Sequence, residues 1–200
     1  MTKYILDSGG LRKNPVKAAL FLNEVTKDLG NSPKILVCFF ARPREDWEKK
    51  FEEYRANLLK AVDDNIEPII ELAFPSSFVD QVKNNDAIII YGGDDHLIQY
   101  WLRQYDLPNI WKDKVVATVS AGSDALVKSF WTCDWRQSMD GLGILPIKFI
   151  PHFNSDFGGD DPRGPIDWDD AYKQITKYGD RSLPIHALEE GDFIVINKAS

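Results

Sequence analysis

The stretch from Lys114 to Ser123 reads KVVATVSAGS and is the most informative part of the chain for the fold. A run of apolar, mostly β-branched residues ends at Ser120, and small residues follow. Such a run predicts a strand that is covered on both faces, as in a parallel sheet. Ala125, Leu126 and Val127 then predict a helix. We therefore expect a strand, a sharp turn and a helix in direct succession.

Working outward from this stretch, short apolar runs alternate with helical patterns along most of the chain. The pattern predicts strands at 3–7, 34–40, 66–72, 87–91 and 114–119, and helices at 15–29, 44–62 and 95–104. Beyond residue 130 it loosens, with short strands expected at 143–150 and 182–196 and a helix at 167–178. This alternation predicts an α/β fold, a three-layer αβα sandwich with a mainly parallel sheet.

The composition is typical of one globular domain, expected to span residues 1–200. The chain has 24 Lys and Arg against 31 Asp and Glu, a formal net charge of −7. An acidic chain lacks the basic face that nucleic-acid binding needs, and no apolar run approaches the roughly 20 residues of a membrane-spanning helix. The N-terminus lacks signal-peptide features, and Cys38 and Cys133 form no disulfide pattern. We expect a cytoplasmic protein that binds neither nucleic acid nor membrane.

The turn at Ser120 is the first candidate site. In a nucleophile elbow, a sharp strand-to-helix turn projects the serine hydroxyl above the sheet, and the next backbone N–H points to where an oxyanion forms. The usual pattern is G-x-S-x-G, and Thr118 departs from it. An ordinary turn in which Ser120 caps the helix remains an equally open interpretation.

A serine nucleophile needs a general base, and the chain has three histidines. His152 follows an apolar stretch at the expected carboxyl end of a strand, where functional residues of α/β sheets gather. His96 is explained by a helix start, and His186 has no evident partner. His152 is therefore the candidate base, although a lone histidine is commonly a hydrogen-bonded structural residue.

Two further features complete the candidate site. A carboxylate must orient the base, and Asp134 is the first candidate, with three alternatives left open: Asp140, Asp156 and Glu189. Residues 91–95 read YGGDD, and paired glycines after a buried strand allow close backbone approach to a ligand. An ordinary tight turn is the competing interpretation, and the pattern is not a dinucleotide fingerprint.

Taken in order, these residues resemble the dipeptidase E (aspartyl dipeptidase) and cyanophycinase family of serine peptidases. The fold of that family is similar to the class I glutamine amidotransferases, which are flavodoxin-like. The segments that carry the resemblance are Tyr4–Gly10, Lys34–Trp47, Ala87–Leu97, Val119–Gly122, Asp140–Leu145 with Pro151–Phe153, and Leu188–Gly191. The departures from the family pattern are Tyr91, Asp94, Thr118 and Ser123.

The resemblance implies a role for each candidate residue. Ser120 is the nucleophile, His152 the general base, and Asp134 occupies about the place of the family's carboxylate. The implied oxyanion donors are backbone N–H groups of Gly92 or Gly93 and of Ala121. An acidic substrate side chain calls for a cation near the serine, and Arg136 is the candidate, with a surface arginine as the competing interpretation.

The expected function is hydrolysis of small peptides through an acyl-enzyme on Ser120, by a dipeptidase or omega-peptidase that accepts dipeptides with an N-terminal aspartate. No metal or organic cofactor is implied, and the expected partner is a small peptide substrate, with the protein a monomer or homodimer. The alternative is a diverged, inactive member of the same fold that binds a small molecule or a partner. The departures in the glycine turn and at Thr118 favour that alternative.

Overall fold

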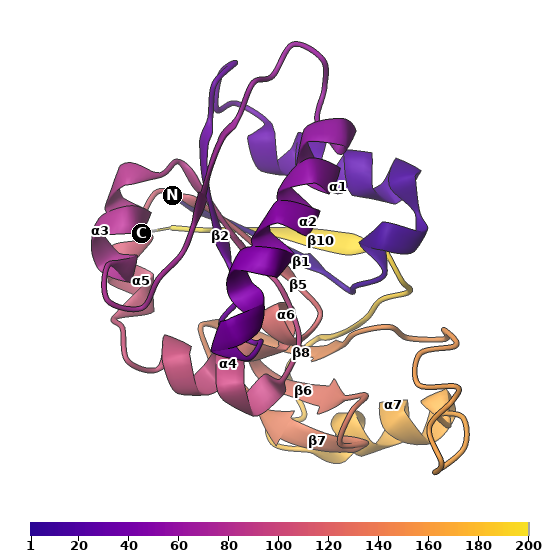
Figure 1. Cartoon of the computed structure of the whole chain (residues 1–200). Helices are drawn as coiled ribbons and strands as arrows, with labels where there is room; N and C mark the ends of the chain where they lie inside the picture. Colours follow the sequence, from indigo (N-terminus) through magenta and orange to yellow (C-terminus); the bar gives the residue numbers. More distant parts are fainter. Residues whose placement is uncertain (200) are drawn as a thin grey trace.

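The larger of two sheets contains the strands that the sequence predicts most clearly. The computed structural model describes residues 1–199, and the strand order of this sheet is β10-β1-β5-β4-β2-β3 (Figure 1). Neighbouring strands are parallel except for β10, which lies antiparallel to β1. The strands are β1 (Thr2–Asp7), β2 (Lys34–Cys38), β3 (Ile69–Leu72), β4 (Ala87–Ile90), β5 (Val115–Val119) and β10 (Phe193–Lys198).

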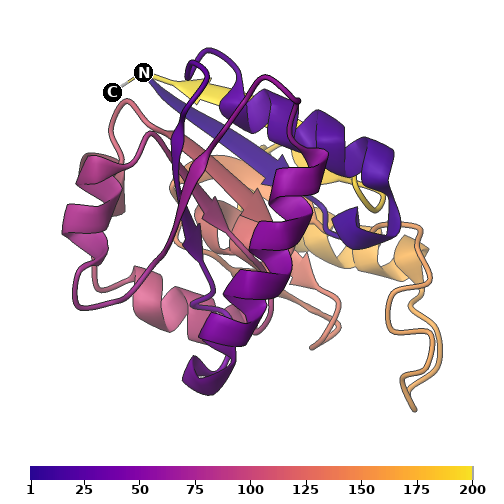
Figure 2. The same cartoon turned by 45° about the horizontal axis from the view of Figure 1, so that its top comes forward.

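Helices cover both sides of this sheet, as the αβα prediction requires. Figures 1 and 2 show α1 and α2 side by side over one face. The helices of this half are α1 (Pro15–Thr26), α2 (Trp47–Ala61), α3 (Phe78–Asn84), α4 (Asp95–Leu102) and α5 (Leu107–Ile110). Every residue of β4 and β5 is buried, which explains why these strands are continuous apolar runs in the sequence. The mainly parallel α/β fold is confirmed.

The helix after Ser120 is much shorter than its apolar start suggests. It is α6 (Ala121–Leu126), and the chain then becomes strand β6 (Val127–Thr132). The assignment of Val127 to a helix was therefore wrong. The segment VKSFWT is rich in β-branched and aromatic residues, which pack well on a pleated surface. The β-branched and aromatic side chains of this segment are all buried, so the strand is favoured over the helix.

β6 belongs to a second sheet that the sequence pattern did not separate from the first. Its strand order is β7-β6-β8-β9, and Figure 1 shows it below the larger sheet with α7 beside it. Its remaining elements are β7 (Gln137–Asp140), β8 (Leu145–Ile150), β9 (Ile185–Ala187) and α7 (Trp168–Lys177). The segment expected as strand at 182–196 thus contributes β9 to this sheet and the start of β10 to the other.

A buried lysine fixes α7 against the second sheet. The side chain of Lys148 on β8 is fully buried, and its Nζ donates to the carbonyl oxygens of Ile175 at 2.8 Å and Tyr178 at 2.5 Å. The Ile175 carbonyl oxygen also accepts from the Tyr178 N–H at 3.3 Å, and a cation at this end of α7 complements the helix dipole. Hydrogen bonds to a charged group are worth about 1.5–3 kcal/mol each. Lys148 therefore sets where α7 ends.

No helix within residues 1–199 combines the length and apolar character needed to cross a bilayer.

Candidate active site

Ser120 stands in a strained turn at the carboxyl end of β5. Its backbone has φ 52° and ψ −120°, a conformation that non-glycine residues rarely adopt. The turn is held by β1, because the Asp7 carbonyl oxygen accepts hydrogen bonds from Ser120 N–H and from the Ser123 hydroxyl, both at 2.9 Å. The elbow geometry that the Ser-Ala-Gly sequence predicted is therefore present.

The two departures from the usual elbow sequence contact each other. The hydroxyls of Thr118 and Ser123 lie 2.9 Å apart, and Thr118 also donates to the carbonyl oxygen of Ile5 at 3.3 Å. Both side chains are fully buried. Buried hydroxyls are tolerated when they are hydrogen-bonded, and here they join β5, α6 and β1. These substitutions thus support the turn instead of disrupting it.

Two glycines allow the β4 turn to approach the elbow closely. A Cβ on Gly92 would lie 2.6 Å from the Val119 carbonyl oxygen and 3.0 Å from the Ala121 nitrogen. A Cβ on Gly122 would lie 2.5 Å from the Ile90 carbonyl oxygen. Any larger residue at either position would push β4 and β5 apart. Glycine is therefore required here for close packing.

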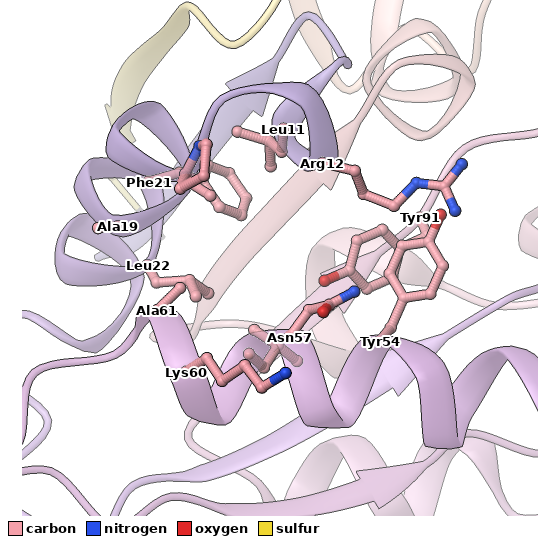
Figure 3. Close-up of a pocket in the computed structure, with 13 residues that line it drawn as sticks. Leu11, Arg12, Ala19, Phe21, Leu22, Tyr54, Asn57, Lys60, Ala61 and Tyr91 are labelled. Carbon is pink, nitrogen blue, oxygen red and sulfur yellow. The ribbon is translucent and has the colours of Figure 1, made fainter.

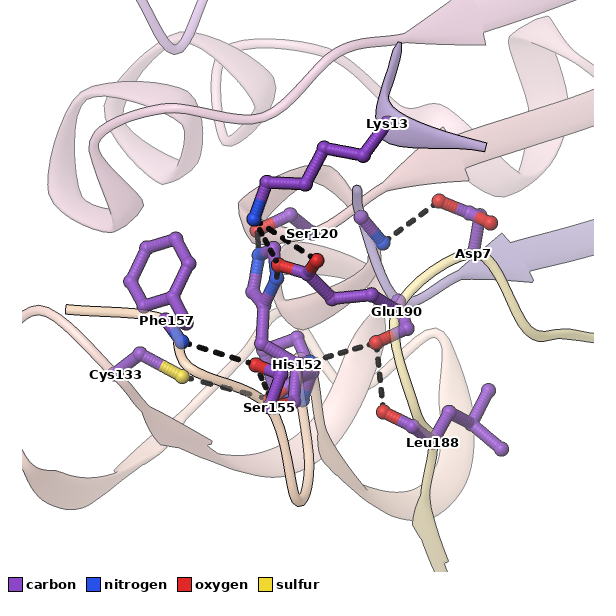
Figure 4. A network of polar contacts seen from close by, with 12 residues as sticks. Asp7, Lys13, Ser120, Cys133, His152, Ser155, Phe157, Leu188 and Glu190 are labelled. Carbon is purple, nitrogen blue, oxygen red and sulfur yellow. Dashed lines mark hydrogen bonds and ion pairs between the residues drawn. The ribbon is translucent and has the colours of Figure 1, made fainter. Parts of the chain in front are cut away.

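His152 lies just after β8 and is held in place by the end of β1. Its backbone has φ 54°, and its N–H donates to the Ser8 hydroxyl at 2.6 Å. Ser8 in turn donates to the Leu188 carbonyl oxygen at 2.7 Å (Figure 4). A Cβ on Gly9 would lie 2.3 Å from His152 Cε1, so the imidazole packs directly on the glycine backbone. The end of β1 thus determines where this ring lies.

The imidazole of His152 connects Ser120 to a glutamate. Nε2 lies 2.9 Å from Ser120 Oγ, and Nδ1 lies 3.0 Å from Glu190 Oε1 (Figure 4). The other oxygen of Glu190 pairs with Lys13 Nζ at 3.0 Å. When Glu190 is ionised, Nδ1 must carry the proton that it donates, and this leaves Nε2 free to accept from the serine hydroxyl. The four side chains form one hydrogen-bonded row.

The ionisation of this row suits neutral pH. Burial lowers the pKa of His152 below its ordinary value, and the hydrogen bond and charge of Glu190 oppose that shift. Burial alone raises the pKa of Glu190, but hydrogen bonds from Lys13 and His152 outweigh it, so the net pKa is lowered. A neutral imidazole beside an ionised carboxylate is the combination that general-base chemistry requires.

The carboxylate on His152 differs from the one expected. Asp134 lines the same cavity but makes no side-chain hydrogen bond within residues 1–199, and Glu190 holds the Nδ1 position instead. Glu189, one of the alternatives, is exposed. Glu190 takes this position because of the turn between β9 and β10. In that turn, Gly191 N–H donates to the Gly9 carbonyl oxygen at 2.6 Å and so places Glu190 over the imidazole. The sequence contained a signal for Glu190. In the Leu188–Gly191 segment, which carries part of the family resemblance, Glu190 is the residue directly before the glycine.

Arg136 also lies elsewhere than expected. Its guanidinium binds the carbonyl oxygens of Arg163, Gly164 and Pro165 and so holds that loop, and it does not line the cavity at Ser120. Three cations line that cavity, Arg12, Lys13 and Arg42, and Arg42 is tied to the glycine turn because its Nε donates to the Gly92 carbonyl oxygen at 3.0 Å. Sequence spacing could not reveal this, because Arg42 follows β2 and reaches the site only through the parallel sheet.

These groups surround a cavity of about 490 Å³. Phe157, from the acidic loop after His152, stacks on the imidazole with ring centroids 4.1 Å apart and forms part of the wall. Within residues 1–199, the backbone N–H groups of Gly92, Gly93 and Ala121 make no hydrogen bond to protein. They therefore remain available to a bound group near Ser120.

Two buried carboxylates, Asp95 and Asp124, and the exposed Asp134 lie together near the elbow, but they do not form a metal site. Asp95, Asp124 and Asp134 line a small cavity of about 20 Å³ that also touches Ser120. Burial raises the pKa of Asp95 to about 6 and raises that of Asp124 well above its ordinary value, with like charges adding to both shifts. In the part of the chain that the structure describes, no group of three His, Cys, Asp or Glu side chains is arranged to hold a metal ion.

Two solved structures have the same fold as this chain. A peptidase from an acI-B1 actinobacterium superposes with a TM-score of 0.65 at 23% identity, over 98% of this chain and 83% of that one. A candidate peptidase E protein from Listeria monocytogenes EGD-e superposes with a TM-score of 0.61 at 14% identity, over 100% of both chains. At these identities the likeness shows the fold alone. No curated protein matches the sequence significantly.

The sequence itself identifies the family. Residues 5–200 match the model of peptidase family S51. This match covers nearly the whole chain and confirms the resemblance to dipeptidase E-like peptidases. The chain therefore belongs to peptidase family S51, and its general activity class is that of a peptidase.

Proposed function

We propose that the protein is a serine peptidase that hydrolyses small peptides through an acyl-enzyme on Ser120. The observation that supports this most strongly is the row from Ser120 through His152 to Glu190, with contacts of 2.9 and 3.0 Å. A hydroxyl, an imidazole and a carboxylate in this order form the constellation of serine hydrolases on several unrelated folds. Strained backbone at both Ser120 and His152 is typical of a functional site.

In the proposed reaction, His152 Nε2 takes the proton from Ser120 as its oxygen attacks the scissile carbonyl carbon. Glu190 holds the imidazole in the required tautomer and stabilises the imidazolium that forms. As the tetrahedral intermediate collapses, the carbon–nitrogen bond breaks and His152 gives its proton to the leaving amine. Water then attacks the acyl-enzyme by the same route and releases the acid.

Backbone donors near Ser120 support the oxyanion in this scheme. Ala121 N–H follows the serine at the start of α6, and the N–H groups of Gly92 and Gly93 approach from the β4 turn. Donors that are already fixed by the fold need no reorganisation when negative charge develops, and one such donor is worth roughly 10²–10³ in kcat.

For the substrate, we propose a short peptide whose N-terminal residue is aspartate. Arg42 supports this choice because it lines the cavity at Ser120, and within residues 1–199 its two terminal nitrogens make no hydrogen bond or ion pair. A guanidinium with a free edge binds a carboxylate in a bidentate manner. Arg42 thus replaces Arg136 as the proposed contact for the acidic side chain.

Replacing the serine tests the mechanism directly. Ser120→Ala removes the nucleophile, and we expect peptide hydrolysis to fall by more than about a thousandfold. The wild type should also be labelled at Ser120 by a fluorophosphonate, whereas the variant should not be labelled. The matched control is Ser182→Ala, which removes an exposed hydroxyl outside the row and should keep the wild-type rate. Full activity in Ser120→Ala, or no labelling of the wild type, contradicts the proposal and favours a binding protein.

Glu190→Gln tests the carboxylate. We expect kcat to fall by roughly 10²–10⁴-fold, because an amide does not hold the imidazole in the required tautomer. Since burial lowers the His152 pKa, the acid limb of the wild-type kcat/KM profile should lie below pH 6.5. Glu190 raises the His152 pKa, so its removal should move that limb to still lower pH.

The control for this test is Glu189→Gln at the exposed neighbouring position. It should keep both the rate and the profile. An unchanged acid limb in Glu190→Gln, or an equal loss in the two variants, rules out the assigned role of Glu190.

The acidic subsite is tested by comparing Asp-Ala with Ala-Ala as substrates. We expect the wild type to prefer Asp-Ala by at least about tenfold, since a charge-assisted contact is worth roughly 1.5–3 kcal/mol. Arg42→Gln should remove this preference and leave Ala-Ala hydrolysis nearly unchanged. Arg136→Gln is the matched control and should keep the preference. Equal rates for the two dipeptides in the wild type would exclude the subsite.

A further inference from the structure

A second cavity, which the proposed reaction does not use, lies between α1 and α2. It has a volume of about 330 Å³ and is lined mainly by apolar side chains (Figure 3). Ala18, Ala19 and Leu22 line it from α1, and Leu58 and Ala61 line it from α2. The volume lies within the range of ordinary ligand pockets, roughly 300–1,000 Å³. The two helices therefore leave an apolar space that their own side chains do not fill.

This apolar pocket borders directly on the cavity at Ser120. Four residues line both spaces: Leu11, Arg12, Tyr54 and Tyr91. The rings of Tyr54 and Tyr91 pack edge to face with centroids 4.4 Å apart, and the Arg12 guanidinium lies 5.6 Å from the Tyr54 ring centroid. The two spaces therefore adjoin at these four residues, which places the apolar pocket next to a peptide bound at Ser120.

The segment Gly9–Lys13 indicates which part of the peptide reaches the pocket. In the proposed reaction, the leaving nitrogen receives its proton from His152 Nε2, so the leaving residue lies on the His152 side. Gly9 packs on that imidazole, and a Cβ on Gly10 would lie 2.7 Å from Glu190 Cβ. From there the chain continues through Leu11 and Arg12 to the edge of the apolar pocket. This segment thus links the His152 side of the reaction cavity to the pocket, which favours the leaving residue as the one whose side chain enters it.

We propose that the apolar pocket between α1 and α2 is a specificity subsite for a large apolar side chain of the leaving residue. This inference rests on the proposed serine peptidase function and adds to it. The preferred substrate is then a peptide with aspartate before the scissile bond and a leucine-like or phenylalanine-like residue after it. Continuity with the reaction cavity favours a substrate side chain as the occupant over a second protein copy.

The subsite is tested with three dipeptides, Asp-Gly, Asp-Leu and Asp-Phe. We expect wild-type kcat/KM to be at least about tenfold higher for Asp-Leu and Asp-Phe than for Asp-Gly, the scale on which apolar pockets discriminate. Ala19→Phe fills the pocket from α1 and should bring this ratio close to one. Val16→Phe on the same helix is the matched control, because Val16 is 70% exposed and does not line the pocket. It should keep the wild-type ratio.

Two measurements separate the subsite from the chemistry. Fluorophosphonate labelling of Ser120 should be unchanged in Ala19→Phe, because the reactive row is not altered. Thermal unfolding should show that the variant is folded. Where Ala19→Phe fails to fold, Ala61→Phe fills the same pocket from α2 and should have the same effect on the ratio.

The outcomes are distinct. Equal rates for the three dipeptides in a labelled, active wild type overturn the subsite and leave the proposed function intact. A preference for Asp-Leu and Asp-Phe over Asp-Gly that persists in Ala19→Phe also overturns the subsite. If the wild type is then a dimer and Ala19→Phe is a monomer, the pocket belongs to an interface with a second copy of the chain. If Ser120 is not labelled and no dipeptide is hydrolysed, the proposed function fails. In that case calorimetric binding of Asp-Leu and Asp-Gly still tests the subsite, and equal affinities overturn it.

Discussion

The arrangement of the site depends on the contacts made by the carboxyl end of β1. With three consecutive residues, Asp7, Ser8 and Gly9, this segment binds the three parts of the chain that carry the reactive row. The Asp7 carbonyl oxygen holds the backbone of Ser120, the Ser8 hydroxyl accepts from His152 N–H, and the Gly9 carbonyl oxygen accepts from Gly191 N–H beside Glu190. Because the segment contains only small residues after Asp7, the imidazole and the glutamate can pack directly against its backbone. The central parallel sheet thereby fixes groups that are up to 70 residues apart in the sequence.

These contacts also explain how the strained residues are maintained. Ser120 and His152 both have positive φ, and such conformations cost of order 1–3 kcal/mol each for residues other than glycine. Each donates its backbone N–H to an acceptor at the end of β1, Ser120 to the Asp7 carbonyl oxygen and His152 to the Ser8 hydroxyl, and the Thr118–Ser123 contact adds a buried link near the serine. The substitutions that made the elbow look diverged are thus part of what stabilises it. Two residues of the row thus have a strained backbone, and the end of one strand supports both. A site whose groups are fixed before substrate binds is expected to contain such strain.

The sequence was most informative where the evidence was local. A buried strand that ends in Ser-Ala-Gly indicates a turn at Ser120, and an apolar run that ends at His152 indicates a strand end, so both residues could be found without a structure. Glu190 was not among the candidate carboxylates, because its place on His152 depends on a turn between two short strands. The role of Arg42 was missed for a similar reason, since only the strand order β5-β4-β2 brings it near the serine. The second sheet was missed because α6 is too short to show a helical period before β6 begins.

The central claim, that the end of β1 positions His152 against Ser120, is tested most directly at Gly9. The measurement is the rate of fluorophosphonate labelling of Ser120 in Gly9→Ala and in Gly30→Ala. Both glycines have positive φ, but a Cβ at Gly9 would lie 2.3 Å from His152 Cε1, whereas one at Gly30 meets nothing within 4 Å. We expect Gly9→Ala to remain folded and to be labelled at least about a hundredfold more slowly, the order of loss expected when a general base is misplaced. Gly30→Ala should be labelled at the wild-type rate. Labelling of Gly9→Ala at that same rate would contradict the account.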